Sequence, residues 1–393
     1  MILDSMLKGM PTGARSRVEE TLDNLSVVLQ MKNPKVFKSM APSAVRGLVL
    51  KQGKQKKPVY MKSNHPVTFD FEYKMDFPEM RRLYQRAVEN QWNADKDLDW
   101  GTDVDPLNPH IPVISNEFLG EESFQKIPVK LTEKQKIELN YNIACWMLSQ
   151  FMHGEQGALY ASAQVTESVG WLEGKLFGGT QVMDEARHLE VFNRYLMEKL
   201  NKRYEINNNL FVILDDLLTD ARWDFKFLGM QIMVEGLALG AFRTIHNMSQ
   251  EPLLKELLKY VIKDEARHVH YGVLALKDHF TNELTDKERQ EREDWAFEVA
   301  VLMKNRFMAH EIYEEWFEGV ISRQQWNDIM THSPGMREFR ENMFNRLIPN
   351  LDFLGLMSPR IKPHYQAQDM LQFIGGKNAS QLTERDMVAD LRG

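Results

Sequence analysis

One five-residue sequence occurs twice in this chain of 393 residues, and it restricts the possible folds more than any other feature. Asp184–His188 reads Asp-Glu-Ala-Arg-His, and Asp264–His268 repeats it letter for letter. For ordinary composition, a second copy arises by chance with a probability on the order of 1 in 10⁴. Each copy also has a glutamate 30 residues before its own glutamate, at Glu155 and Glu235. The chain therefore contains an internal repeat with an offset of 80 residues.

The residue types of this repeat are those of a metal site. Glutamate and histidine at positions i and i+3 lie on one face of a helix, so both can point at one ion. A gap of 30 residues lets one helix end, turn and return antiparallel, with the two glutamates level. Carboxylates with one nitrogen per ion suit iron or manganese better than zinc or copper. The candidate metal ligands are Glu155, Glu185, His188, Glu235, Glu265 and His268.

The alternative is that these are ordinary side chains on helix surfaces. The hydrophobic stripe around Glu155 argues against this, because Phe151 and Leu159 flank it at intervals of four and place it on the buried face. A lone buried carboxylate is costly unless it is paired or bound to a metal. The same pattern recurs on the other three predicted helices, which favours a metal site.

Periodicity and capping signals predict the other elements and their grouping. The predicted helices are one over 79–92, one from the capping box at Thr132, one carrying 182–196, one following Asn209 and running to Phe242, one from Pro252, one from the capping box at Thr285 to about Phe317, and a short one from Pro334. Alternating apolar and polar residues predict a short strand over 67–73. We expect an N-terminal extension over 1–125, the metal-binding bundle over 126–284, and additional helices with a C-terminal tail packed on the bundle over 285–393.

The aspartate that opens each box has two possible roles. It could form an ion pair on the outer surface with the arginine three residues later, Arg187 or Arg267. However, a histidine that binds a metal needs an acceptor for its second ring nitrogen, commonly a carboxylate. With twofold pseudosymmetry that acceptor comes from the other box. We therefore expect Asp264 to hold His188 and Asp184 to hold His268.

Paired Asp-Glu-x-Arg-His boxes, each with an upstream glutamate, resemble the ferritin-like non-haem di-iron oxygenase and oxidase superfamily. This superfamily includes the small subunit of ribonucleotide reductase, and the resemblance covers Glu155 to His268. It implies an all-α fold, a ferritin-like four-helix bundle with additional N- and C-terminal helices. It also implies a cofactor of two iron ions, or a manganese–iron pair, with O₂ as co-substrate.

Three further positions are compared with this superfamily. Trp92 resembles the tryptophan that precedes the bundle in the reductase small subunit, which implies an indole near Asp264. That subunit carries its radical tyrosine four residues past the first ligating histidine, where this chain has Phe192. The arylamine N-oxygenases have an extra histidine one turn before the last glutamate, where this chain has Val261. The candidate residues of a substrate pocket are Phe151, Leu159, Phe192 and Leu239.

The function that the resemblance implies is O₂ activation to oxidise a small organic substrate by hydroxylation, N-oxygenation or desaturation. A radical-generating subunit and an iron-storage protein are the alternatives. Cys145 is the single cysteine, and there is no Gly-x-Gly-x-x-Gly loop, so the chain has neither the ligands of an iron–sulfur cluster nor a dinucleotide motif. We therefore expect a separate electron donor, a ferredoxin or a reductase.

Composition restricts the partners and the location. A net charge of −7 argues against a nucleic-acid partner recognised through bulk charge. The sequence shows no run of 18 apolar residues, and Asp4 interrupts the start of any signal peptide. We expect a cytoplasmic protein without a membrane partner, assembled as a homodimer.

Overall fold

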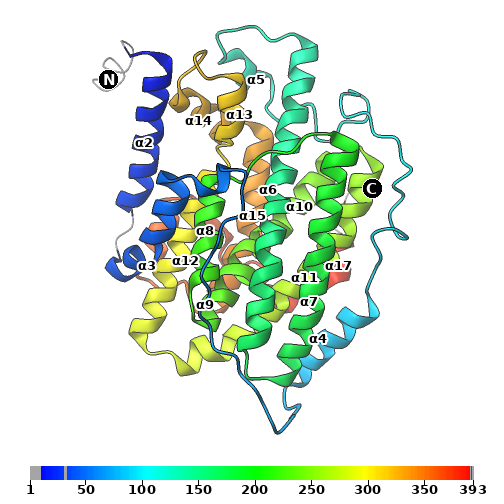
Figure 1. The fold of residues 1–393 in the computed structure, drawn as a ribbon, viewed down its shortest axis with the longest axis vertical. Coiled ribbons are helices and arrows are strands. Elements are labelled where there is room, and N and C mark those ends of the chain that lie inside the picture. The colour runs from blue at the N-terminus through cyan, green and yellow to red at the C-terminus, as the bar shows by residue number, and fades with distance from the viewer. Residues whose placement is uncertain (1–9, 31–32, 390, 392–393) are drawn as a thin grey trace.

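The protein is built from helices that surround a central bundle (Figure 1). The computed structural model describes residues 10–30, 33–389 and 391. Within these residues there is no β-strand, only an isolated bridge between Glu318 and Ile321. The main helices are α2 (Thr12–Gln30), α3 (Pro34–Ala44), α4 (Pro78–Glu89), α5 (Glu121–Gln125), α6 (Glu133–Ser168), α7 (Leu172–Arg194), α8 (Asn208–Thr219), α9 (Trp223–Phe227), α10 (Glu235–Met248), α11 (Pro252–Asp278), α12 (Asp286–Arg306), α13 (His310–Trp316), α14 (Arg323–His332), α15 (Pro334–Phe353), α16 (Lys362–Gln366) and α17 (Glu384–Ala389). The all-α fold class predicted from the sequence is confirmed.

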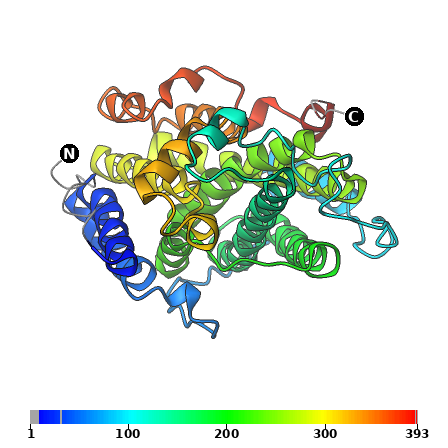
Figure 2. The same cartoon turned by 90° about the horizontal axis from the view of Figure 1, so that it is seen from above.

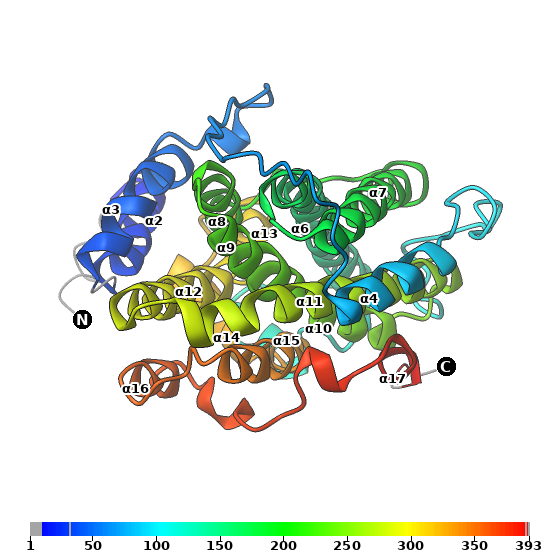
Figure 3. The ribbon, with the colours of Figure 1, turned by 90° about the horizontal axis from the view of Figure 1, so that it is seen from below.

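Two helical hairpins, α6–α7 and α10–α11, form the four-helix bundle. The capping box of Thr132 and Gln135 starts α6, and the side chain of Glu251 accepts two backbone hydrogen bonds at the start of α11. Each hairpin has a short connection, so its helices run antiparallel and pack along their lengths. α7 also packs against α11, which joins the two hairpins around one shared interior (Figure 3).

The third helix of the bundle is interrupted, which corrects the prediction of one helix from Asn209 to Phe242. α8 ends at Thr219, and the chain resumes as α9, followed by the π-helical turn η4 (Leu228–Val234) and then α10. The break has a local cause: the side chain of Asp220 accepts from the backbone N–H of Arg222 and also pairs with its guanidinium. Aspartate that bonds to nearby backbone competes with helix formation. Both α8 and α9 bury apolar residues, so the hydrophobic periodicity passes through the break unchanged.

Additional helices cover the outside of the bundle. α2 and α3 lie on the side of α8 and α12, while α15 to α17 lie along the opposite face (Figures 2 and 3). α4 crosses α7 and α11 at one end, and α17 packs on α11. α4 and α17 therefore cover the outer side of the helices that carry the two Asp-Glu-Ala-Arg-His boxes.

Several predicted elements differ from the structure. The strand over 67–73 is wrong: Asp70 bonds to the backbone of Glu72, Tyr73 has a φ of 52°, and the aromatic side chains of this segment are exposed. The helix predicted from Thr285 to Phe317 is two helices, because Ala309 adopts a left-handed φ of 47° between α12 and α13. The helix predicted over 79–92 ends at Glu89, and the helix at Pro334 has 20 residues rather than being short.

One segment of the described residues, Trp223–Met248, is long and apolar enough to cross a membrane by length and composition alone. However, 94% of its most apolar window is buried inside the protein. This segment is the interrupted third helix of the bundle, and a helix that is apolar on all sides is expected in such an interior.

Candidate metal centre

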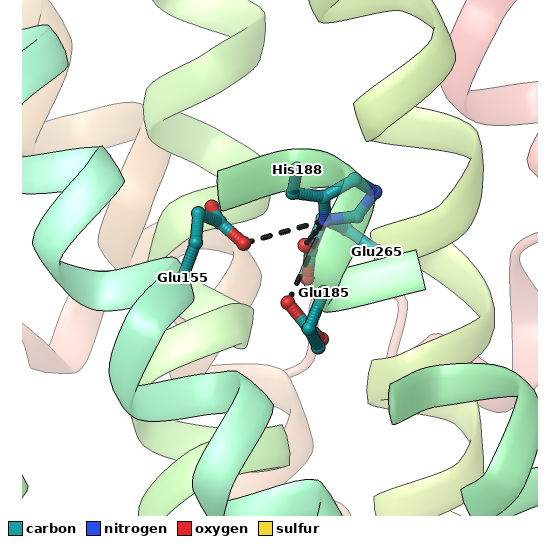
Figure 4. A group of neighbouring side chains, drawn as sticks. All are labelled: Glu155, Glu185, His188 and Glu265. Carbon is teal, nitrogen blue, oxygen red and sulfur yellow. Dashed lines mark hydrogen bonds and ion pairs between the residues drawn. The ribbon is translucent and has the colours of Figure 1, made fainter. Parts of the chain in front are cut away.

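The six predicted ligands converge in the middle of the bundle. Glu155 comes from α6, Glu185 and His188 from α7, Glu235 is the first residue of α10, and Glu265 and His268 come from α11. All six side chains are buried, and the most accessible of them, Glu155, is 5% exposed. Figure 4 shows Nδ1 of His188 facing the carboxylates of three different helices.

The ligands form two groups that share two carboxylates. Glu155, Glu185, His188 and Glu265 make one group, and Glu185, Glu235, Glu265 and His268 make the other. Within each group the ligand atoms lie within 4.8 Å of one another, close enough for one ion. Because Glu185 and Glu265 belong to both groups, they are placed to bridge two ions. The chain thus builds a site for a two-metal centre with the ligand set of ferritin-like carboxylate proteins.

The hydrogen bonding of these side chains fits metal ions. Oε2 of Glu185, Glu235 and Glu265 and Nδ1 of His268 are buried without a hydrogen-bond partner. Leaving one buried polar atom unpaired costs about 1–3 kcal/mol, and more for a charged group. Four such atoms at the junction of four helices are therefore accounted for if they bind metal.

Each histidine is held from outside by the aspartate of the other box. His188 Nε2 lies 3.0 Å from Asp264 Oδ2, and His268 Nε2 lies 3.2 Å from Asp184 Oδ2. An N–H donated to a carboxylate fixes the tautomer and leaves Nδ1 free for a metal. This is the crossed arrangement expected from the sequence.

The ion pairs considered as the alternative are also present, but they are buried rather than on the outer surface. Arg187 Nη2 lies 2.5 Å from Asp184 Oδ1, and Arg267 pairs with Asp264. Both arginines are at most 6% exposed. Each aspartate therefore holds a histidine and an arginine together, which keeps the carboxylate ionised next to the ligand.

Two polar residues of this layer were missed by the sequence analysis, and Trp92 was expected there. The indole Nε1 of Trp92 donates to Asp264 Oδ2 at 2.7 Å. Gln91 donates to Asp184 at 2.9 Å, and Gln181 donates to Glu235 at 2.9 Å. Gln181 stands one helical turn before Glu185, a spacing that could have indicated it.

The predicted pocket residues are only partly assembled. Phe151 and Phe192 are buried with ring centroids 6.1 Å apart, and Phe242 packs on both. Leu239 is buried, whereas Leu159 is half-buried. Cavities of about 930 and 1130 Å³ lie on the outer faces of α11 and α6, and the six ligands do not line them.

Burial and mutual proximity perturb the protonation of the metal-free site. Burial raises the pKa of Glu155 and that of Glu235 well above the ordinary value, and neighbouring carboxylates add to this. Burial also acts to raise the pKa of Glu185, but the two imidazoles outweigh it and hold that pKa well below the ordinary value. Burial opposes protonation of His188 and His268, yet the surrounding carboxylates raise the pKa of both. Metal binding must therefore displace protons.

The stability of the metal-free protein should fall as the pH rises. Glu155, Glu235 and both histidines have folded pKa values above their ordinary values of 4.5 and 6.5. Such a group stabilises the fold below its unfolded pKa, and this contribution is lost as the pH rises through the folded pKa. Glu185, with its lowered pKa, contributes above 4.5 and loses its contribution only as the pH falls. We expect the melting temperature with chelator to decrease between about pH 6 and 9.

Metal should reverse this dependence, because the ligands bind ions only when deprotonated. The measurement is thermal unfolding followed by circular dichroism, with chelator and with excess Mn²⁺, at several pH values. A melting temperature that rises with pH in the chelator series would contradict the assignment of protons to the buried carboxylates.

Comparison with known proteins gives one structural similarity. No protein-family model and no curated protein sequence matches the chain. A solved structure of an R2-like ligand-binding oxidase, a point mutant with an aerobically reconstituted Mn/Fe cofactor, superimposes with a TM-score of 0.40 at 17% identity. The match covers 69% of this chain and 94% of that chain. At this similarity, the roles of individual residues rest on the geometry described above.

Proposed function

We propose that this chain is an O₂-activating non-haem di-iron oxygenase or oxidase that acts on a small organic substrate. The observation that carries the proposal is the pair of buried ligand groups that share Glu185 and Glu265. Two ions held by common carboxylates are close enough to act on one small molecule together. A radical-generating role is the alternative that Trp92 favours, and it is tested separately below.

The choice of metal follows from the ligand atoms. Each group offers three carboxylates and one imidazole. Oxygen-rich sites of this kind suit iron and manganese, whereas structural zinc sites prefer cysteine and histidine. We propose two iron ions, with a manganese–iron pair as the variant. When bound, such a pair supplies the electrons and the Lewis acidity that activate O₂.

The chain's own residues hold, orient and shield this centre. The aspartates of the two boxes fix the imidazoles, and the arginines keep those aspartates charged. The phenylalanine cluster of Phe151, Phe192 and Phe242 covers the side next to Glu155 with apolar surface and excludes water there. Exclusion of water protects a reactive oxidant and favours an apolar part of a substrate.

A direct test loads the metal-free protein with Fe²⁺ without oxygen and then adds O₂. Absorbance reports oxidation of the metal, while mass spectrometry of a cell extract in the same reaction reports products formed only with O₂. O₂-dependent oxidation of a small molecule supports the proposal. Uptake of many iron ions per chain, without a product, would instead indicate storage and overturn it.

We also propose that the electrons come from a separate protein, or from the substrate itself. The chain lacks the cysteines and the glycine-rich loop that an internal route would need. With NADPH as the only reductant, we expect a single turnover and then no further O₂ consumption, followed with an oxygen electrode. Adding a ferredoxin and its reductase should restore turnover. Sustained NADPH consumption by this chain alone would exclude a separate donor.

Trp92 is proposed as the entry point for single electrons. Its indole is hydrogen-bonded to Asp264, which in turn holds His188. Trp92→Phe keeps the aromatic bulk and removes the donor N–H. We expect this variant to fold and to bind two metal ions, but to slow the one-electron step of Fe²⁺ oxidation about 10-fold or more. Stopped-flow absorbance at equal metal content measures it.

A matched control exists in Trp100, whose indole donates to the backbone carbonyl of Ala94 rather than to a residue of the metal centre. Trp100→Phe should leave the oxidation kinetics unchanged. If Trp92→Phe also matches the parent, Trp92 only packs the loop after α4 onto the bundle.

A further inference from the structure

The internal repeat is broken in the layer around the metal ligands. Residues related by the offset of 80 are apolar next to Glu155 but polar or small next to Glu235. All of these positions are buried. The pairs are Phe151 with Gln231, Val261 with Gln181, Phe192 with Gly272, and Phe242 with Ser162.

The two sides differ in how their space is filled. On one side, the rings of Phe151 and Phe242 lie 4.7 Å apart, and those of Phe192 and Phe242 lie 5.6 Å apart. On the other side, a Cβ placed on Gly272 would lie 2.6 Å from Cβ of Gln231. Glycine at 272 therefore makes room for the amide side chain of Gln231, where the repeat has a phenylalanine.

Gln181 uses this arrangement to hold a metal ligand. Its Nε2 lies 2.9 Å from Glu235 Oε1 and 3.2 Å from Glu185 Oε1, and its Oε1 accepts from Gln231 Nε2 at 3.3 Å. The orientation of the amide is determined, because an ionised carboxylate can only accept hydrogen bonds. With Oε1 of Glu235 engaged by Gln181, Oε2 remains unpaired and available for an ion.

Glu155 has no equivalent support from the repeat. The position that corresponds to Gln181 is Val261, which cannot donate a hydrogen bond. The contact of Glu155 is with His188 Nδ1 at 3.3 Å, an atom that itself points at the metal position. A carboxylate without a donor behind it is less restricted in orientation when an ion binds.

We infer that Gln181 is a positioning residue that makes the two metal sites unequal. By fixing Glu235 in one orientation, it strengthens the site formed by Glu185, Glu235, Glu265 and His268. The site that contains Glu155 is the weaker one, and it lies beside the phenylalanine cluster. This inference rests on the metal centre of the proposed function but not on its O₂ chemistry.

The test is a titration of the metal-free protein with Mn²⁺ in the absence of oxygen, with free Mn²⁺ measured by electron paramagnetic resonance. We expect the parent to bind two ions in two steps that differ at least about 10-fold in affinity. Glu235→Ala should abolish the tighter step and Glu155→Ala the weaker one. Gln181→Met, which keeps the shape but has no donor, should weaken the tighter step about 10- to 100-fold and leave the other unchanged.

Gln150 provides the control, because it is a buried glutamine of α6 that bonds to the backbone of Glu205 and Asn207 instead. Gln150→Met should lower thermal stability without changing either affinity. If Gln181→Met fails to fold, Gln231→Met removes the bond that orients Gln181 and should weaken the same step by less. Equal affinities in the parent, or an unchanged tighter step in the variants of Gln181 and Gln231, would overturn the inference. Absence of any Mn²⁺ binding would instead refute the metal centre itself.

Discussion

Glu185→Ala is expected to lose more metal than any other single substitution in the chain except that of Glu265. Glu185 belongs to both ligand groups, so its loss removes a donor from both ions at once. Loss of a residue that merely supports a ligand costs 10–100-fold in affinity or activity, and loss of a bridging ligand should cost at least about 100-fold. Metal analysis after gel filtration should fall from two ions per chain to one or none. Reaction of the Fe²⁺-loaded protein with O₂ should decrease accordingly.

The matched control is Glu190→Ala, which removes an exposed glutamate from the same helix, α7. It should keep two ions and full reactivity. Glu155→Ala and His268→Ala each remove a ligand of one group and should lose at least one ion. Retention of two tightly bound ions in all three ligand variants would refute the assignment of the centre, whatever the substrate.

The ligands could be found from the sequence because their spacing is set by helix geometry and is repeated. A glutamate and a histidine separated by three residues must share a face, and the second copy makes chance unlikely. The crossed pairing of Asp184 and Asp264 follows from the same symmetry. Gln181 could not be found in this way because its counterpart in the repeat is Val261. Gln91 lies in the loop after α4, and only the tertiary fold brings it to Asp184.

The breaks between helices were harder to predict, because hydrophobic periodicity reports burial rather than backbone continuity. The stripe passes from α8 to α9 although the chain turns at Asp220. Likewise, Ala309 carries no glycine or proline signal for its left-handed conformation between α12 and α13. The segment over 67–73 has strand-forming residues but no partner strand within the described residues. Local preference alone did not decide its structure.

The packing of α15 against the bundle depends on Gly240, and Gly240→Ala is expected to be strongly destabilising. A Cβ at this position would lie 2.3 Å from the carbonyl oxygen of Asn342 and 2.7 Å from Cα of Met343. Overpacking in a core usually costs 1–3 kcal/mol. Here the obstacle is the backbone of another helix, which cannot rotate away, so we expect about 3 kcal/mol or more. The measurement is the thermal and urea unfolding midpoint of the metal-free protein.

Gly236 lies on the same helix one turn earlier and is the matched control. A Cβ there would meet its nearest side-chain atoms at 4.0 Å, which is ordinary contact. Since alanine is favoured over glycine in a helix by about 1 kcal/mol, Gly236→Ala should be neutral or slightly stabilising. The hydrogen bond from Asn342 to Thr244 shows that α10 and α15 are in close register beyond Gly240. If Gly240→Ala unfolds no earlier than Gly236→Ala, α15 does not pack on α10 at this distance. The additional helices would then contribute less to the support of Glu235 than the close approach implies.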